Sequence, residues 1–183
     1  MQKTLEIPDG VKVGMEQGNL VVCGPNGELR KPIKGVKVGI GDKEVTLSSG
    51  TERRKEKALV GTWSAHLRNM IIGVTQGWEA KLKVVYSHFP VKFNIEGERV
   101  VIQNFMGERK PRVAKIFGNT KVEVKKDEIL ITGTDKDEVG QTAANIELTT
   151  KVKGYDRRVF QDGCHLIQKC RPIEKPEEGE KND

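Results

Sequence analysis

The sequence predicts an α+β fold made by tandem duplication of a small unit, in which each copy is an antiparallel, partly open sheet packed with one helix. Residues 11–28, VKVGMEQGNLVVCGPNGE, align without a gap on residues 91–108, VKFNIEGERVVIQNFMGE, and apolar positions match apolar positions. In each copy, short stretches of alternating apolar residues precede one stretch with helical spacing. We therefore expect a first unit at 1–87, a second unit at 88–171, and a disordered acidic tail at 172–183.

Four short strands joined in hairpins are expected at the start of the first unit. Apolar residues alternate with others at 11–15, 36–40 and 45–47, which is typical of strands with one buried face. An apolar run at 20–23 leads into the turn signal Gly24-Pro25-Asn26-Gly27.

A further strand is expected at 82–86, where Leu82, Val84 and Tyr86 alternate. We assign it to the first unit, because the Ser87-His88-Phe89-Pro90 segment that follows is typical of a joint between units: a residue before proline is pushed out of helical conformation.

One helix is expected in each unit. Apolar residues recur with helical spacing between positions 52 and 75, which predicts a helix that ends before Gly77. A second, shorter helix is expected from Asp135, and the spacing of Asp135 and Glu138 is that of a capping box. Its inner face consists of Val139, Ala143, Ile146 and Thr150.

Composition favours a basic cytoplasmic protein. The chain has 183 residues, with 32 Lys and Arg against 26 Asp and Glu, and a net charge of +6, which favours an acidic partner. It has no apolar run of the roughly 18 residues that span a bilayer, and no apolar signal core, so we expect no membrane partner. The three cysteines form no C-x-x-C pair and predict neither disulfides nor a zinc site.

Catalytic chemistry is not indicated. There is no phosphate-binding loop of the G-x-x-x-x-G-K-[ST] type. The DKDEVG stretch at 135–140 imitates a calcium loop but has Ile146 where the twelfth position needs a carboxylate. The histidines, His88 in the linker among them, are interpreted as uninvolved in metal binding. We predict a protein that is not an enzyme, with no catalytic residue, metal, cofactor or small-molecule substrate.

Cationic side chains gather at two places in the second unit. One cluster lies at 149–163, TTKVKGYDRRVFQDG, where Asp156 is the only acid among the cations and Tyr155 lies among them. By itself this cluster is as typical of a solvated loop as of a surface that binds a polyanion such as folded RNA. The second cluster is at a turn marked by Gly107 and Pro111. The basic start of the first helix is interpreted as a solvated first turn.

Three segments resemble the large-subunit ribosomal protein six family, in its archaeal and eukaryotic branch. They are GVTQGWEAKLKVVYSHFPVKF at 73–93, NFMGERKPR at 104–112 and TTKVKGYDRRVFQDG at 149–163, the last being the most specific. The bacterial branch has a different Pro- and Lys-rich signature at this last place. The resemblance covers nearly the whole chain except the acidic tail.

The resemblance implies a structural constituent of the large ribosomal subunit that binds large-subunit ribosomal RNA, chiefly through its second unit. The expected location is near the stalk base, the sarcin–ricin loop and the translation-factor site, beside neighbouring ribosomal proteins. The implied RNA-binding residues are Lys151, Lys153, Tyr155, Arg157, Arg158, Arg109, Lys110 and Arg112. The implied structural turn consists of Gly154, Asp162 and Gly163.

Some alternatives remain open from the sequence. Phe160 fits either a core position in a strand or an RNA contact. A non-ribosomal module that binds proteins through its sheet edges would also account for a basic tandem fold. An enzyme that acts on RNA is a third possibility, although no residue pattern points to it.

Overall fold

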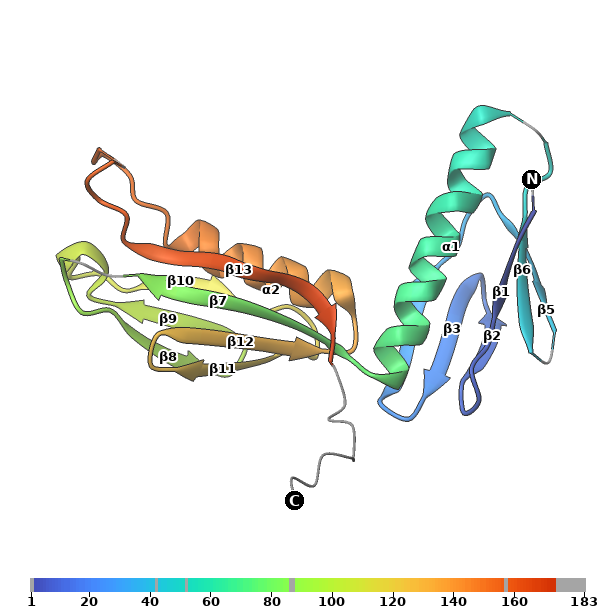
Figure 1. Ribbon diagram of the computed structural model, residues 1–183, viewed down its shortest axis with the longest axis horizontal. Helices are drawn as coiled ribbons and strands as arrows, with labels where there is room; N and C mark the ends of the chain where they lie inside the picture. Colours follow the sequence, from blue (N-terminus) through green and yellow to red (C-terminus); the bar gives the residue numbers. More distant parts are fainter. Residues whose placement is uncertain (1, 42, 52, 86–87, 157, 174–183) are drawn as a thin grey trace, which may run out of the picture. The chain divides into compact units, whose positions relative to one another are not determined.

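The computed structural model describes residues 2–41, 43–51, 53–85, 88–156 and 158–173 (Figure 1). The chain divides into two compact units, one formed by Met1–Gly77 with Pro172–Asp183 and the other by Trp78–Arg171. Each unit combines small β-sheets with one α-helix, so the predicted α+β class is confirmed. The predicted disorder of the tail concerns mainly 174–183, which lies outside the described residues.

The first unit consists of two three-stranded antiparallel sheets and a long helix. One sheet has the order β1-β6-β5 and the other β2-β3-β4. The bounds are β1 Gln2–Glu6, β2 Lys12–Glu16, β3 Asn19–Gly24, β4 Gly27–Pro32, β5 Lys37–Ile40, β6 Glu44–Ser48 and α1 Arg54–Thr75.

Within its described residues, the first unit therefore has six strands before its helix, where the sequence predicted four. The strands β1 and β4 were missed because neither shows apolar alternation. In β1, QKTLE, Leu5 is the only large apolar residue and none of the five residues is buried. In β4, GELRKP, the same holds for Leu29. Both strands are specified by pairing with an apolar neighbour rather than by their own pattern.

Helix α1 packs directly on the β3–β4 hairpin. A Cβ atom at Gly24 would lie 2.7 Å from the Cγ2 atom of Val74, so only glycine allows this approach. The backbone N–H of Asn26 also donates to the carbonyl of Val74 over 2.9 Å. The core beneath the helix includes Leu20, Val22, Leu47, Leu67 and Met70.

The second unit has one three-stranded and one four-stranded sheet, with the orders β10-β9-β8 and β11-β12-β7-β13. Helix α2 packs against β7, β10 and β12. The bounds are β7 Trp78–Val85, β8 Lys92–Glu96, β9 Arg99–Gln103, β10 Arg112–Lys115, β11 Lys121–Lys125, β12 Glu128–Gly133, α2 Lys136–Thr149 and β13 Gly163–Pro172.

Strand β7, which the sequence assigned to the first unit, is a central strand of the second. It pairs with β12, with Trp78 opposite Gly133 and Leu82 opposite Ile129. The division therefore falls after Gly77 rather than after residue 87. In the first unit β1 pairs with β6 in the same way, so each copy starts with a strand that joins its last hairpin.

The N-terminus of α2 is capped by Asp135 as expected, but Asp135 and Glu138 do not form the predicted capping box. Asp135 is the N-cap, and its side chain accepts a hydrogen bond of 3.0 Å from the backbone N–H of Asp137. The carboxylate of Glu138 accepts instead from the backbone N–H of Asn119, at 3.3 Å. The buried face of the helix contains Val139, Thr142, Ala143 and Ile146, close to the predicted inner face.

Two differences between the copies concern the segments that follow β9 and α2. In the first unit β3 and β4 are joined by a tight hairpin, in which Gly24 is opposite Gly27, whereas eight residues, 104–111, separate β9 from β10. Helix α2 ends at Thr149 and the chain then forms a loop into β13, a strand without a counterpart among the described strands of the first unit. Both departures carry the basic clusters of the second unit.

The described helices include none that is both long enough and apolar enough to cross a membrane. Within the same residues, no group of three or more His, Cys, Asp or Glu side chains is placed to hold a metal ion.

Candidate nucleic-acid interface

Residues 150–162, which we call the basic loop, connect the end of α2 to β13. Lys151 and Lys153 are exposed, and Val152 between them is buried, with 7% of its surface accessible. The valine therefore holds this part of the chain against the unit while both lysines point to solvent. Arg158 is also exposed. The predicted contact Arg157 lies outside the described residues.

Thr150 joins the two ends of the basic loop. This residue is 1% exposed and is the C-cap of α2. Its hydroxyl oxygen accepts a 2.9 Å hydrogen bond from the backbone N–H of Cys164, the second residue of β13. The same hydroxyl lies 3.1 Å from the carbonyls of Ile146 and Glu147, to which it can donate. The loop is therefore closed at its base by one buried side chain.

We expect Thr150→Val, which keeps the shape and removes the hydroxyl, to destabilise the second unit by about 1–2 kcal/mol, because the buried Cys164 amide loses its acceptor. The chain has two tryptophans, Trp63 in α1 and Trp78 in β7. In a Trp63→Phe background, the fluorescence of the buried Trp78 reports urea unfolding of the second unit alone. Thr149→Val is the matched control and is expected to change stability by less than about 0.5 kcal/mol. Equal effects of the two substitutions would contradict this role of Thr150.

The end of the loop is fixed by a buried carboxylate. Asp162 is 4% exposed, and its oxygens accept from the backbone N–H of His88 at 3.3 Å and lie 2.9 Å from its Nδ1 atom. His88, which the sequence predicted to be uninvolved in metal binding, thus connects the segment before β8 to the basic loop. No motif in the sequence pairs positions 74 residues apart, so this contact had no local signal.

Three aromatic rings follow one another at the loop. The ring of Phe160 lies between that of His88, with centroids 4.5 Å apart, and that of Tyr155, with centroids 4.8 Å apart. Tyr155 is 55% exposed and Phe160 is half-buried. Phe160 is therefore neither a strand residue nor a core residue, because it precedes β13 and contacts a ring that is largely in solvent.

The tip of the loop is a tight turn built around Asp156. Its carboxylate accepts a 3.0 Å hydrogen bond from the backbone N–H of Arg158, and its carbonyl accepts one of 2.9 Å from the N–H of Phe160. The ion pair between Asp156 and the Nε atom of Arg158 is long, at 3.7 Å, and the two side chains are 59% and 93% exposed. Such a pair contributes little, so the guanidinium remains free to bind an anion.

A cavity of about 430 Å³ lies at the base of the loop. Its lining includes Lys151, Phe160, Gly163, Cys164 and His165. Burial raises the pKa of the Cys164 thiol to about 12, so the thiol is neutral and unreactive at physiological pH. The acidic residues Glu147 and Asp162 also line the cavity, which therefore combines one lysine, aromatic rings and two carboxylates, and has no reactive thiol.

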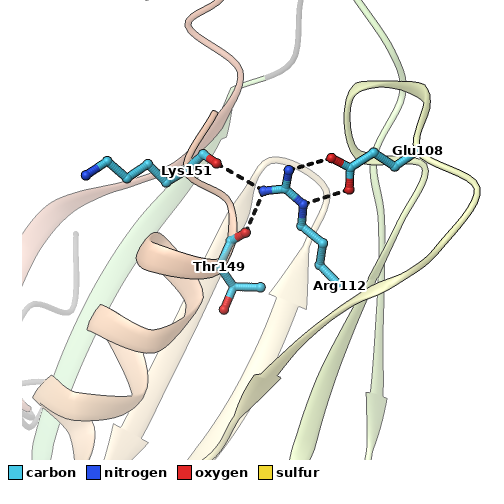
Figure 2. A network of polar contacts seen from close by, with 4 residues as sticks. All are labelled: Glu108, Arg112, Thr149 and Lys151. Atoms are coloured by element: carbon cyan, nitrogen blue, oxygen red, sulfur yellow. Dashed lines mark hydrogen bonds and ion pairs between the residues drawn. The ribbon is translucent and has the colours of Figure 1, made fainter. Parts of the chain in front are cut away.

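Arg112 clamps the start of the basic loop (Figure 2). Its Nη1 atom donates to the carbonyls of Thr149 at 2.8 Å and Lys151 at 3.0 Å, where the helix C-terminus favours positive charge. The rest of the guanidinium binds the Glu108 carboxylate with two hydrogen bonds, of 2.8 Å from Nε and 2.5 Å from Nη2. It also lies 4.3 Å from the ring centroid of Phe105. The structure therefore gives Arg112 a positioning role at the start of the basic loop, and the RNA contact expected of it stays a prediction.

The clamp also has an electrostatic effect on Glu108. The hydrogen bond from Arg112 lowers the pKa of this carboxyl below its usual value. A lowered pKa means that the pair stabilises the fold above the ordinary carboxyl pKa, and that this contribution is lost as the pH falls through the folded-state value. Since Glu108 is 41% exposed, the contribution is screened by solvent.

The 104–111 segment is joined to the basic loop by further contacts. The Nδ2 atom of Asn104 donates to the carbonyl of Pro90 over 3.0 Å, and the ring of Phe89 lies 3.3 Å from the Cβ position of Gly107. Because His88 contacts Asp162, residues 88–90 link both segments. We call their exposed cations the basic surface: Arg109, Lys110, Lys151, Lys153 and Arg158. Within the described part of the chain, only Arg158 of this set forms an ion pair.

Comparison with known proteins places the chain in a family. The family described as "Ribosomal protein L6" matches residues 7–77 and 89–163, one stretch in each copy of the fold. The chain belongs to the ribosomal protein L6 family. It is 47% identical over 170 residues to large ribosomal subunit protein uL6 of Methanosarcina mazei, covering 92% of this chain and 97% of that protein. The uL6 protein of Methanobrevibacter smithii is 48% identical over 171 residues, covering 92% and 96%.

Membership of the L6 family confirms four further predictions. The match in two stretches agrees with tandem duplication, and the relatives support the archaeal branch. A member of this family has a structural ribosomal role and is not an enzyme. The second matched stretch runs from residue 89 to 163, so it contains the 104–111 segment and the whole basic loop.

Proposed function

We propose that this L6 protein binds large-subunit ribosomal RNA mainly through the basic surface of its second unit, in the cytoplasmic ribosome. We place it near the stalk base and the sarcin–ricin and translation-factor site, in contact with neighbouring ribosomal proteins. The observation that supports RNA binding is that two separate basic segments are locked into one surface by Arg112 while the other cations stay exposed.

The charge of this surface suits phosphates. Each free Lys or Arg that neutralises a phosphate releases condensed counterions, which gives affinity without reading sequence. The clamp lowers the cost of ordering the loop on binding, because the base of the loop is already fixed by Arg112 and Thr150. Family membership leaves no reason to keep the non-ribosomal interaction module as an alternative.

We expect the triple variant Lys151→Ala, Lys153→Ala, Arg158→Ala to bind a transcript of large-subunit ribosomal RNA about 10- to 100-fold more weakly at moderate salt. The plot of log affinity against log salt should become shallower by about 2–3, because about three phosphate contacts are lost. Filter binding over a series of salt concentrations measures both quantities.

The first unit offers a matched control. Arg53, Arg54 and Lys55 at the start of α1 are also exposed, so their triple alanine variant removes the same charge. We expect it to retain most of the affinity and the slope. If both triple variants lose affinity equally, binding depends on net charge alone, and if the loop variant binds normally, the basic surface is not the site.

A further inference from the structure

The aromatic residues of the basic loop lie partly in solvent rather than in the core. Tyr155 is 55% exposed and lies at the outer end of a series of three rings. Its contact with Phe160, at 4.8 Å and an angle of 52°, holds the tyrosine in place and leaves most of its surface in solvent. The ring is also set within two residues of Lys153 and three of Arg158.

The support behind Tyr155 reaches into the interior of the unit. Phe160 stacks at 4.5 Å on His88, and the Nδ1 atom of His88 lies 2.9 Å from the carboxylate of Asp162, which is 4% exposed. A buried carboxylate therefore fixes the histidine, the histidine supports the phenylalanine, and the phenylalanine supports the tyrosine. A preorganised ring at an exposed tip loses little conformational entropy when another ring stacks on it.

We propose that Tyr155, Phe160 and His88 form a stacking platform that binds one unpaired base of the RNA. This inference rests on the proposed RNA binding and specifies the kind of RNA: a bulge, loop or strand end with an unstacked base, rather than a continuous duplex. Sequence-tolerant stacking on aromatic side chains is the usual way in which proteins hold such bases. Tyr155 is the contact residue, and His88 and Asp162 are positioning residues.

The space beside the platform fits a nucleotide. The cavity of about 430 Å³ borders Phe160 and Lys151, and its volume lies within the roughly 300–1,000 Å³ of small-molecule sites. The base would be held by the ring of Tyr155, and its sugar and phosphate have room beside the lysine. Base stacking would then depend on Tyr155 and phosphate binding on Lys151, so mutation of each residue separates the two contributions.

The test compares loop variants for binding to a transcript of large-subunit ribosomal RNA at several salt concentrations. Tyr155→Ala is expected to weaken binding about 10-fold or more with an unchanged salt slope, because a stacking ring carries no charge. Tyr155→Phe, which keeps the ring, is expected to bind within about twofold of the wild type. Val159→Ala is the matched control, because Val159 is an equally exposed loop residue, at 61%, without a ring.

A second measurement detects the stack directly. Ultraviolet irradiation of the wild-type complex should crosslink the peptide that contains Tyr155 to a base, and Phe160→Leu, which removes the supporting ring, should reduce this yield. Normal binding by Tyr155→Ala beside weakened binding by the Lys151, Lys153, Arg158 variant would overturn the platform and leave the proposed function intact. Normal binding by both would overturn the proposed function. An equal loss in Val159→Ala would also overturn the platform.

Discussion

Arg112→Met is expected to destabilise the second unit by about 2–3 kcal/mol and to weaken RNA binding without changing the salt slope. The substitution keeps an apolar stem over Phe105 but removes the guanidinium of a side chain that is only 20% exposed. The carbonyls of Thr149 and Lys151 lose a charged donor at the end of a helix, and Glu108 loses its partner.

Two measurements separate the effects of Arg112→Met. Urea unfolding followed by Trp78 in the Trp63→Phe background gives the stability of the second unit. RNA binding over a series of salt concentrations gives the slope, which should stay at the wild-type value because Arg112 neutralises no phosphate in our account.

Arg109→Met is the control for this prediction. Arg109 is an exposed neighbour in the same segment, and we count it in the basic surface. It should leave stability within about 0.5 kcal/mol of the wild type and make the salt slope shallower by about 1. If Arg112→Met changes the slope instead, Arg112 contacts phosphate directly and our view of the clamp is wrong.

Gly163→Ala is expected to destabilise the second unit by about 3 kcal/mol. Gly163 has a φ of +147°, which side chains rarely adopt, and an added Cβ atom would lie 3.0 Å from the carbonyl oxygen of Thr150. The backbone cannot move away from this contact, because the next residue donates its N–H to the buried Thr150 hydroxyl. The same Trp78 unfolding assay measures the loss.

Gly154→Ala tests whether the contact or the backbone angle dominates. Gly154 has a φ of +80°, but a Cβ atom there would meet nothing within 4 Å. We therefore expect a loss of only about 1 kcal/mol from strain. Similar losses in the two variants would show that the contact of Gly163 with Thr150 adds no penalty.

Elements with their own periodic pattern could be predicted from the sequence, and elements specified by their neighbours could not. The apolar spacing of Leu67, Met70 and Val74 predicted α1 because one face of that helix is buried. Strand β1 exposes almost all its side chains and exists through its pairing with β6, so QKTLE gave no signal. The unit boundary was misplaced for the same reason, because it depends on the pairing of β7 with β12.

The candidate site shows the same division. The cations of the basic loop could be identified from the sequence, because residue type determines charge. The sequence could not tell that Arg112 is engaged by carbonyls of Thr149 and Lys151, which lie more than 35 residues away. Nor could it connect His88 with Asp162, since that contact depends on how the loop returns to β13. Residue types predicted a cationic surface, and only the fold showed which cations are engaged within the protein and which remain exposed.

Strand β13 is the last strand of the second unit to be synthesised, and it closes the base of the basic loop. The hydroxyl of Thr150 is held by the N–H of Cys164, and β13 is the final strand of the described chain. During synthesis, α2 and all the cations of the basic loop leave the ribosome before the strand that closes the loop. A growing or truncated chain that ends before Gly163 therefore carries the charge without the closed base of the loop. The closed base of the loop therefore depends on β13, the last strand of the described chain.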